Sequence, residues 1–122
     1  AQVLKLLSEL REKRNLSMLF ITHDLRVACY FCDRIGVMYR GVLVEEADAA
    51  TLYKSSLHPY TKLLFEAAMM FKINSSVEVK TMLEKENACP FAHRCPKAEK
   101  RCFEECPDLT ERENGHKVRC WF

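Results

Sequence analysis

The sequence predicts an α/β fold that is followed by a small, cysteine-rich extension. An amphipathic segment at residues 2–14 precedes a short apolar run at 15–22, and a helix followed by a buried strand is half of an α/β unit. Residues 34–46 carry β-type residues on both sides of Arg40-Gly41, which indicates a hairpin. Five of the seven cysteines lie after residue 88, where aliphatic residues become scarce.

Composition narrows the class of protein. The chain has 122 residues and a formal net charge of only +2, so strong electrostatic binding to nucleic acid or anionic lipid over a large surface is not expected. No apolar run approaches the roughly 18 residues that span a bilayer. No secretory leader is visible, and the cysteine count is odd, so reduced thiols are favoured over a disulfide framework. Because the first residue is Ala1, we expect a start further upstream.

The sequence of the N-terminal part predicts two helices, a strand and a hairpin. Apolar residues in 2–14 recur at helical spacing, and residues 15–22 form a continuous run typical of a strand buried on both faces. Residues 25–32 are expected to form a short helix with Asp24 near its start, where a carboxylate is favourable. The hairpin strands are expected at 34–39 and 42–46.

Further helices and two boundaries are predicted downstream. A short helix is expected at 48–54, and a longer one at 60–71 with Pro59 in its first turn. Residues 77–82 are compatible with a short strand, and a boundary is expected around 72–80. We divide the chain into residues 1–46, a helical linker at 47–79 and a cysteine-rich extension at 80–122.

The apolar strand at 17–22 has too few potential partners in this chain. Only the two hairpin strands could join it, which is little for an α/β layer whose faces must both be covered. We therefore expect residues 1–46 to be the tail of a larger nucleotide-type domain. The alternative is a compact, independent α+β domain.

Several ordered segments resemble the ATP-binding subunits of ABC transporters. LFITHD at 19–24, followed by CDRIGVMYRGVLVEE, is similar to the strand, switch histidine and hairpin of that P-loop NTPase fold, and AQVLKLLSEL resembles the helix after its D-loop. LHPYTKLLFEAA and the cysteine-rich end resemble the oligopeptide, dipeptide and nickel importer subfamily. One departure is Ala47, where the family commonly has glycine.

The resemblance implies a role for His23, the position of the switch histidine. That residue contacts the γ-phosphate of ATP and helps to orient the attacking water, so His23 is the expected catalytic and cofactor-binding residue. The complete subunit would use ATP and Mg²⁺. This sequence contains no GxxxxGK[ST] loop, signature segment, Walker B carboxylate or Q-loop glutamine. Because hydrolysis needs these groups together, we expect the chain alone to be inactive.

The late cysteines predict a metal site. Four converging thiolates would stabilise a segment that lacks an aliphatic core, and both Zn²⁺ and a [4Fe–4S] cluster accept four thiolates. The first spacings are wider than CxxC pairs, which favours the cluster mildly, as does the subfamily resemblance. The family pattern matches Cys89, Cys95, Cys102 and Cys120 and leaves out Cys106. The alternative is a set of free cysteines or disulfides.

Other candidate residues are given structural roles. Cys29 and Cys32 form a CxxC within an apolar helical stretch, where small core residues are the expected interpretation. His58 is expected to start a helix rather than to act in catalysis. His93 and His116 are expected to be exposed loop residues, although either residue type can ligate a metal.

The resemblance implies a peptide importer at the cytoplasmic face of the cell membrane. The ATP-binding subunit would couple ATP hydrolysis to peptide uptake, together with a second ATP-binding subunit, membrane permease subunits and, indirectly, a solute-binding protein. The alternative function is a stand-alone regulatory or interaction module that senses metal or redox state. A zinc-type nucleic-acid binder is disfavoured, because Lys97, Lys100 and Arg101 are interleaved with glutamates.

Overall fold

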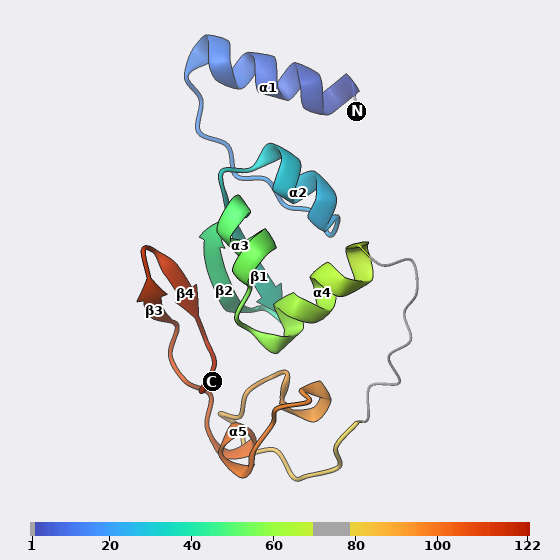
Figure 1. Cartoon of the computed structure of the whole chain (residues 1–122), viewed down its shortest axis with the longest axis vertical. Helices are drawn as coiled ribbons and strands as arrows, with labels where there is room; N and C mark the ends of the chain where they lie inside the picture. The colour runs from blue at the N-terminus through green and yellow to red at the C-terminus, as the bar shows by residue number, and fades with distance from the viewer. Residues whose placement is uncertain (1, 70–78) are drawn as a thin grey trace.

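The computed structural model describes residues 2–69 and 79–122, in which helices and a four-stranded sheet alternate (Figure 1). The N-terminal elements are α1 (Gln2–Arg14), α2 (Leu25–Phe31), β1 (Arg34–Tyr39), β2 (Val42–Asp48), α3 (Ala49–Ser55) and α4 (Pro59–Met69). The C-terminal elements are the 3₁₀ turn η1 (Ala92–Arg94), α5 (Lys100–Glu104), β3 (Thr110–Glu113) and β4 (His116–Val118). Among the described residues, none of these helices has the length and apolar character needed to cross a bilayer.

The predicted hairpin is the centre of the fold. Along β1 the side chains alternate strictly between exposed and buried, with Ile35, Val37 and Tyr39 facing inward. Arg40 and Gly41 both have positive φ, 48° and 79°, as a tight two-residue turn between twisted antiparallel strands requires. The hairpin and its turn are therefore where the sequence predicts them.

A β-bulge interrupts the pairing of β1 with β2. Val37 pairs with Glu45 and Met38 pairs with Leu43, so Val44 is an extra residue on β2. A bulge breaks the two-residue alternation of side chains. As a result, Val44 and Glu45 are adjacent in sequence yet both are completely buried.

The C-terminal hairpin extends the same sheet. The strand order is β1-β2-β4-β3, and all neighbours are antiparallel. Glu45 pairs with Val118 and Glu46 with Lys117, so β4 lies beside β2 although some seventy residues separate them in the chain. Arg119 strengthens this junction, because its backbone N–H donates to Val44 O at 2.8 Å and its Nε donates to Leu43 O at 2.9 Å.

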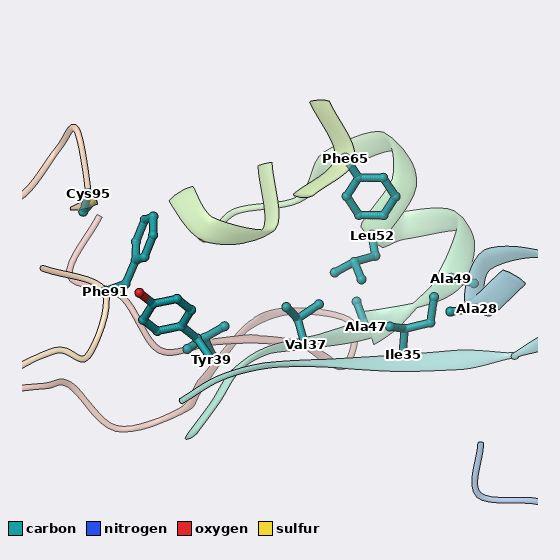
Figure 2. Close-up of a cluster of buried hydrophobic side chains, with 11 residues drawn as sticks. Ala28, Ile35, Val37, Tyr39, Ala47, Ala49, Leu52, Phe65, Phe91 and Cys95 are labelled. Carbon is teal, nitrogen blue, oxygen red and sulfur yellow. The ribbon is translucent and has the colours of Figure 1, made fainter. Parts of the chain in front are cut away.

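The hydrophobic core lies between the sheet and the helices α3 and α4. Figure 2 shows Leu52 of α3 and Phe65 of α4 above the inward-facing side chains of β1. At the other end of this core, Phe91 is 1% exposed and its ring lies 5.2 Å from that of Tyr39 and 5.4 Å from that of Tyr60. Phe91 thus joins the cysteine-rich segment to the core of the hairpin.

The apolar run at 15–22 is not a strand, so that prediction is wrong for this chain. Residues 16–22 have no regular secondary structure, and Leu19 and Ile21 are 92% and 88% exposed. A strand needs a neighbour for its backbone N–H and C=O groups, and the described sheet offers none to this segment. The structure also has no strand at Val79–Met82, whereas Val77 lies outside the described residues.

The N-terminal helix has little contact with the rest of the chain. Helix α1 matches its prediction, but none of its residues is buried, and it lies at one end of the molecule (Figure 1). Arg11 makes the main contact: its Nη1 donates to the Phe31 carbonyl at 3.1 Å, and its guanidinium lies over the Phe31 ring. Part of the apolar side of α1 is consequently exposed, with Val3 and Leu6 at 68% and 57%, whereas Leu4 and Leu7 are half-buried.

Candidate functional site

His23 lies exposed at a bend immediately before helix α2. The next residue, Asp24, caps this helix, because its Oδ1 accepts hydrogen bonds from the backbone N–H groups of Arg26 at 3.0 Å and Val27 at 3.4 Å. Thr22 fixes the other side of the bend, since its Oγ1 accepts from the Asp24 N–H at 3.0 Å. The His23 imidazole therefore has a fixed backbone beneath it and can present a donor or an acceptor outward.

A small pocket gathers the four cysteines that the family pattern singles out. Cys89, Cys95, Cys102 and Cys120 all line it, and His58 lines it as well. The pocket has room for about one water-sized body, roughly 20 Å³. Sequence segments as far apart as the start of α4 and the end of the chain thus meet at one point.

Short backbone hydrogen bonds bring these cysteines together. The N–H of Cys89 donates to Cys102 O at 2.8 Å, which joins the segment before η1 to helix α5. The η1 turn begins as Ala92 N–H donates to Cys89 O at 3.0 Å and ends as Cys95 N–H donates to Ala92 O at 3.3 Å. Because η1 closes so tightly, it carries Cys89 and Cys95 to the same pocket.

Burial opposes the ionisation of two thiols of this pocket, Cys89 and Cys95. The pKa of Cys89 is raised to about 12, chiefly by burial and to a smaller extent by charge repulsion from the neighbouring thiols. Burial likewise raises the pKa of Cys95. A thiol becomes a metal ligand only as the thiolate, so a bound cation would reverse this balance and release protons.

The thiols are not preassembled at ligand spacing. Within residues 2–69 and 79–122, no group of three or more His, Cys, Asp or Glu side chains is close enough to hold a metal ion. The donor type and the shared pocket suit a thiolate-bound group, and the side chains would have to close around it.

Cys106, which the family pattern leaves out, lies beside Cys89 but does not line the pocket. Its side chain hydrogen-bonds with that of Cys89, and its backbone N–H donates to Asn87 O at 2.7 Å. Burial raises the pKa of Cys106, as it does for Cys89 and Cys95. Cys29 and Cys32 pack instead against the main core, as the sequence predicts.

A buried carboxylate that sequence reasoning missed lies next to this pocket. Glu45 is completely buried and accepts three hydrogen bonds: Oε1 from Leu57 N–H at 2.6 Å and from His116 Nε2 at 2.6 Å, and Oε2 from His58 N–H at 3.0 Å. These bonds connect β2, the N-terminus of α4 and β4. The only sequence signal was the glutamate pair itself, and the bulge at Val44 decides which glutamate turns inward.

His58 connects the cysteine pocket to the hydrogen-bond network of Glu45. Its backbone N–H binds Glu45, and its ring Nδ1 accepts a hydrogen bond from Tyr60 N–H at 3.1 Å, which caps the first turn of α4. The ring is 1% exposed and lies 5.9 Å from the Phe91 ring. Burial lowers the pKa of His58 to about 4, so this imidazole is neutral at physiological pH.

His116 and His93 differ from the prediction that they are exposed loop residues. His116 begins β4, is 6% exposed and donates to Glu45, because strand pairing turns it inward. His93 is half-buried; its Nδ1 bonds to Lys80 O at 2.9 Å and its Nε2 to Glu84 at 2.8 Å. These hydrogen bonds, the one to Lys80 foremost, raise the pKa of His93. Neither ring lines the cysteine pocket.

Comparison with known proteins matches part of this chain to a described family. Residues 44–102 match the family described as "Oligopeptide/dipeptide transporter, C-terminal region". The chain corresponds to the C-terminal region of oligopeptide transport ATP-binding proteins. The matched residues contain the buried Glu45, the His58 segment and three of the four pocket cysteines, so the family match overlaps most of this pocket region.

Curated relatives of this oligopeptide transport family align along nearly the whole chain. The putative oligopeptide transport ATP-binding protein YkfD of Bacillus subtilis is 38% identical over 129 aligned positions, which cover 98% of the chain and 39% of the relative. AppD of the same organism, an oligopeptide transport ATP-binding protein, is 40% identical, with 99% and 39% covered. OppF of Haemophilus influenzae, also an oligopeptide transport ATP-binding protein, is 35% identical, with 98% and 39% covered. The chain thus spans about 39% of the length of these relatives.

Proposed function

We propose that the chain serves as the C-terminal part of an ATP-binding subunit that couples ATP binding and hydrolysis to the import of peptides. The observation that carries the proposal is the match of residues 44–102 to the transporter family, together with the alignment of 98% of the chain to ATP-binding relatives. The partners are a second ATP-binding subunit and membrane permease subunits at the cytoplasmic face of the membrane, with a solute-binding protein acting indirectly.

Within that subunit, His23 is proposed to contact the γ-phosphate of Mg²⁺-bound ATP. An exposed imidazole above a rigid helix cap supports this role, since phosphate recognition needs a donor on a fixed backbone. The groups that cradle phosphate and hold Mg²⁺ are missing from this sequence, so the chain alone is proposed to be inactive. Magnesium-dependent ATP hydrolysis by the 122-residue chain would contradict this.

The second part of the proposal is a structural metal centre in the cysteine pocket. Cys89, Cys95, Cys102 and Cys120 would hold a [4Fe–4S] cluster, with Zn²⁺ as the alternative, because all four line one pocket. When bound, such a group supplies four strong bonds that cross-link η1, α5 and the C-terminal end. The proposed organisation keeps three segments, 1–46, 47–79 and 80–122, with the pairing of β4 and β2 joining the first to the last.

A chimera tests the proposed function. The C-terminal 39% of the Bacillus subtilis relative AppD is replaced by this chain, and magnesium-dependent ATPase activity and peptide uptake are measured in the assembled transporter. We expect both activities to be retained, and His23→Ala to lower the ATPase rate on the order of 100-fold. His93→Ala, a histidine of the extension, should leave the rate within about twofold. An assembled chimera with full activity after His23→Ala would contradict the proposed role.

A further inference from the structure

His58 is placed to interact with whatever the cysteine pocket holds. Its side chain lines the pocket beside the four thiols, while its backbone belongs to the network of Glu45. We propose that His58 donates a hydrogen bond from Nε2 to a sulfur of the metal centre held by Cys89, Cys95, Cys102 and Cys120, and is a positioning residue for that centre. This inference rests on the proposed metal site.

The hydrogen bonds of His58 fix which ring nitrogen carries the proton. Nδ1 accepts from the Tyr60 backbone N–H, so Nδ1 has no proton of its own. A neutral imidazole with an unprotonated Nδ1 carries its proton on Nε2. Nε2 makes no hydrogen bond to any residue that the structure describes, which leaves this donor available to the pocket.

The surroundings hold the ring in place. Glu45 Oε2 accepts from the His58 N–H at 3.0 Å, and the neighbouring Phe91 ring lies 5.9 Å away. The side chain therefore enters the pocket from a helix start that three partners fix. Ordered donors of this kind act more strongly on a buried anion than on one in water, because little solvent competes.

A thiolate or sulfide is the acceptor that such a donor fits. A neutral thiol is a weak acceptor, whereas a metal-bound sulfur carries negative charge and accepts a charge-assisted hydrogen bond. Hydrogen bonds to sulfur stabilise the more negative state of a centre and orient its ligands. His58 would thus link the HPY segment to the cysteine-rich extension chemically as well as by packing.

The test compares three variants of the full 122-residue chain. His58→Phe removes the donor but keeps an aromatic ring against Phe91. His58→Gln keeps an N–H donor near the position of Nε2. His93→Phe is the matched control, because His93 lies between Cys89 and Cys95 in sequence but outside the pocket lining.

Each chain is loaded anaerobically in two arms, with Cd²⁺ alone and with Fe²⁺ plus sulfide. Binding affinity is measured in the first arm, and the reduction potential of the cluster in the second. If the wild type binds Cd²⁺, we expect His58→Phe to weaken that binding about 10-fold or more. If the wild type forms a cluster, we expect His58→Phe to lower the reduction potential of the cluster. His58→Gln and His93→Phe should remain within about threefold of the wild-type affinity and close to its potential.

The outcomes separate the two proposals. A wild type that binds its probe through the four cysteines, with His58→Phe unchanged in affinity and potential, overturns the hydrogen bond and leaves the metal site standing. A wild type that accepts neither probe overturns both. If His58→Phe does not fold, NMR of the ¹¹³Cd-loaded or iron–sulfur-loaded wild type decides: a His58 Nε2–H protected from solvent exchange by loading supports the inference, and an Nε2–H that still exchanges rapidly overturns it.

Discussion

Replacing Glu45 by glutamine should destabilise the fold far more than the same change at the next residue. Glu45 is completely buried and accepts three hydrogen bonds, whereas Glu46 is partly exposed and pairs with Arg34 at 3.1 Å on the surface. The two glutamates are neighbours on β2 and the change is isosteric at both. The pair thus isolates the effect of burial and hydrogen bonding from strand propensity and net charge.

The magnitude follows from the three donors that Glu45 satisfies. A glutamine offers one acceptor oxygen in place of two, and its amide N–H₂ would face at least one backbone N–H. Hydrogen bonds to a charged group contribute about 1.5–3 kcal/mol, and a buried donor that is left unsatisfied costs about 1–3 kcal/mol. We therefore expect Glu45→Gln to lower the free energy of unfolding by about 3 kcal/mol. Glu46→Gln should cost less than about 1 kcal/mol, as exposed ion pairs do.

Urea denaturation at pH 7 measures this difference. Trp121, the sole tryptophan, lies next to the cysteine pocket and reports on the extension, while far-UV circular dichroism reports on the helices and sheet. Since Glu45 ties β2, α4 and β4 together, both signals should shift to lower urea by the same amount. If Glu45→Gln proves as mild as Glu46→Gln, the network does not stabilise the fold as argued.

Three further predictions concern stability. The hydroxyl of Thr61 is buried without a hydrogen-bond partner in the described chain, so Thr61→Val should raise the free energy of unfolding by about 1 kcal/mol. The control, Thr51→Val, removes a 3.1 Å hydrogen bond to Asp48 and should lower the free energy of unfolding. Equal effects of the two changes would refute the claim that the Thr61 hydroxyl is unsatisfied. Gly41→Ala should cost about 1 kcal/mol or more in thermal or urea unfolding because Gly41 has φ 79°, and a neutral result would contradict the turn geometry. In the metal-free chain, the lowered pKa of His58 means that this side chain takes up a proton in the unfolded state before it does so in the folded state. The free energy of unfolding should therefore fall by roughly 2–4 kcal/mol as pH drops from about 6.5 to about 4. Urea titrations of His58→Gln should show a weaker dependence of stability on pH, and a dependence identical to that of the wild type would refute this role of His58.

Local patterns in the sequence predicted the local elements well. The helical spacing of 2–14, the Arg40-Gly41 turn and Pro59 at a helix start each act within a few residues, and α1, the hairpin and α4 form there. The prediction of a strand at 15–22 was wrong because a strand depends on neighbouring strands that no local pattern supplies. The composition of this segment suits a buried strand, but the residues that the structure describes leave most of it exposed.

The site was predictable only in part, since its polar half depends on long-range pairing. The family resemblance singled out four cysteines, and these four line one pocket. The burial of Glu45 follows from the bulge at Val44, and that of His116 from the pairing of β4 with β2, and neither register is visible in sequence. The role of the four cysteines as metal ligands stays a prediction.

Native mass spectrometry of the anaerobically purified chain tests the central claim most directly, namely that four cysteines hold one metal centre. We predict the mass of one [4Fe–4S] cluster, or of one zinc ion, per chain. This added mass should disappear in Cys89→Ser and Cys120→Ser and persist in Cys29→Ser, whose thiol packs in the main core. A metal-free mass of the wild type, with all seven of its thiols open to alkylation, would contradict the account.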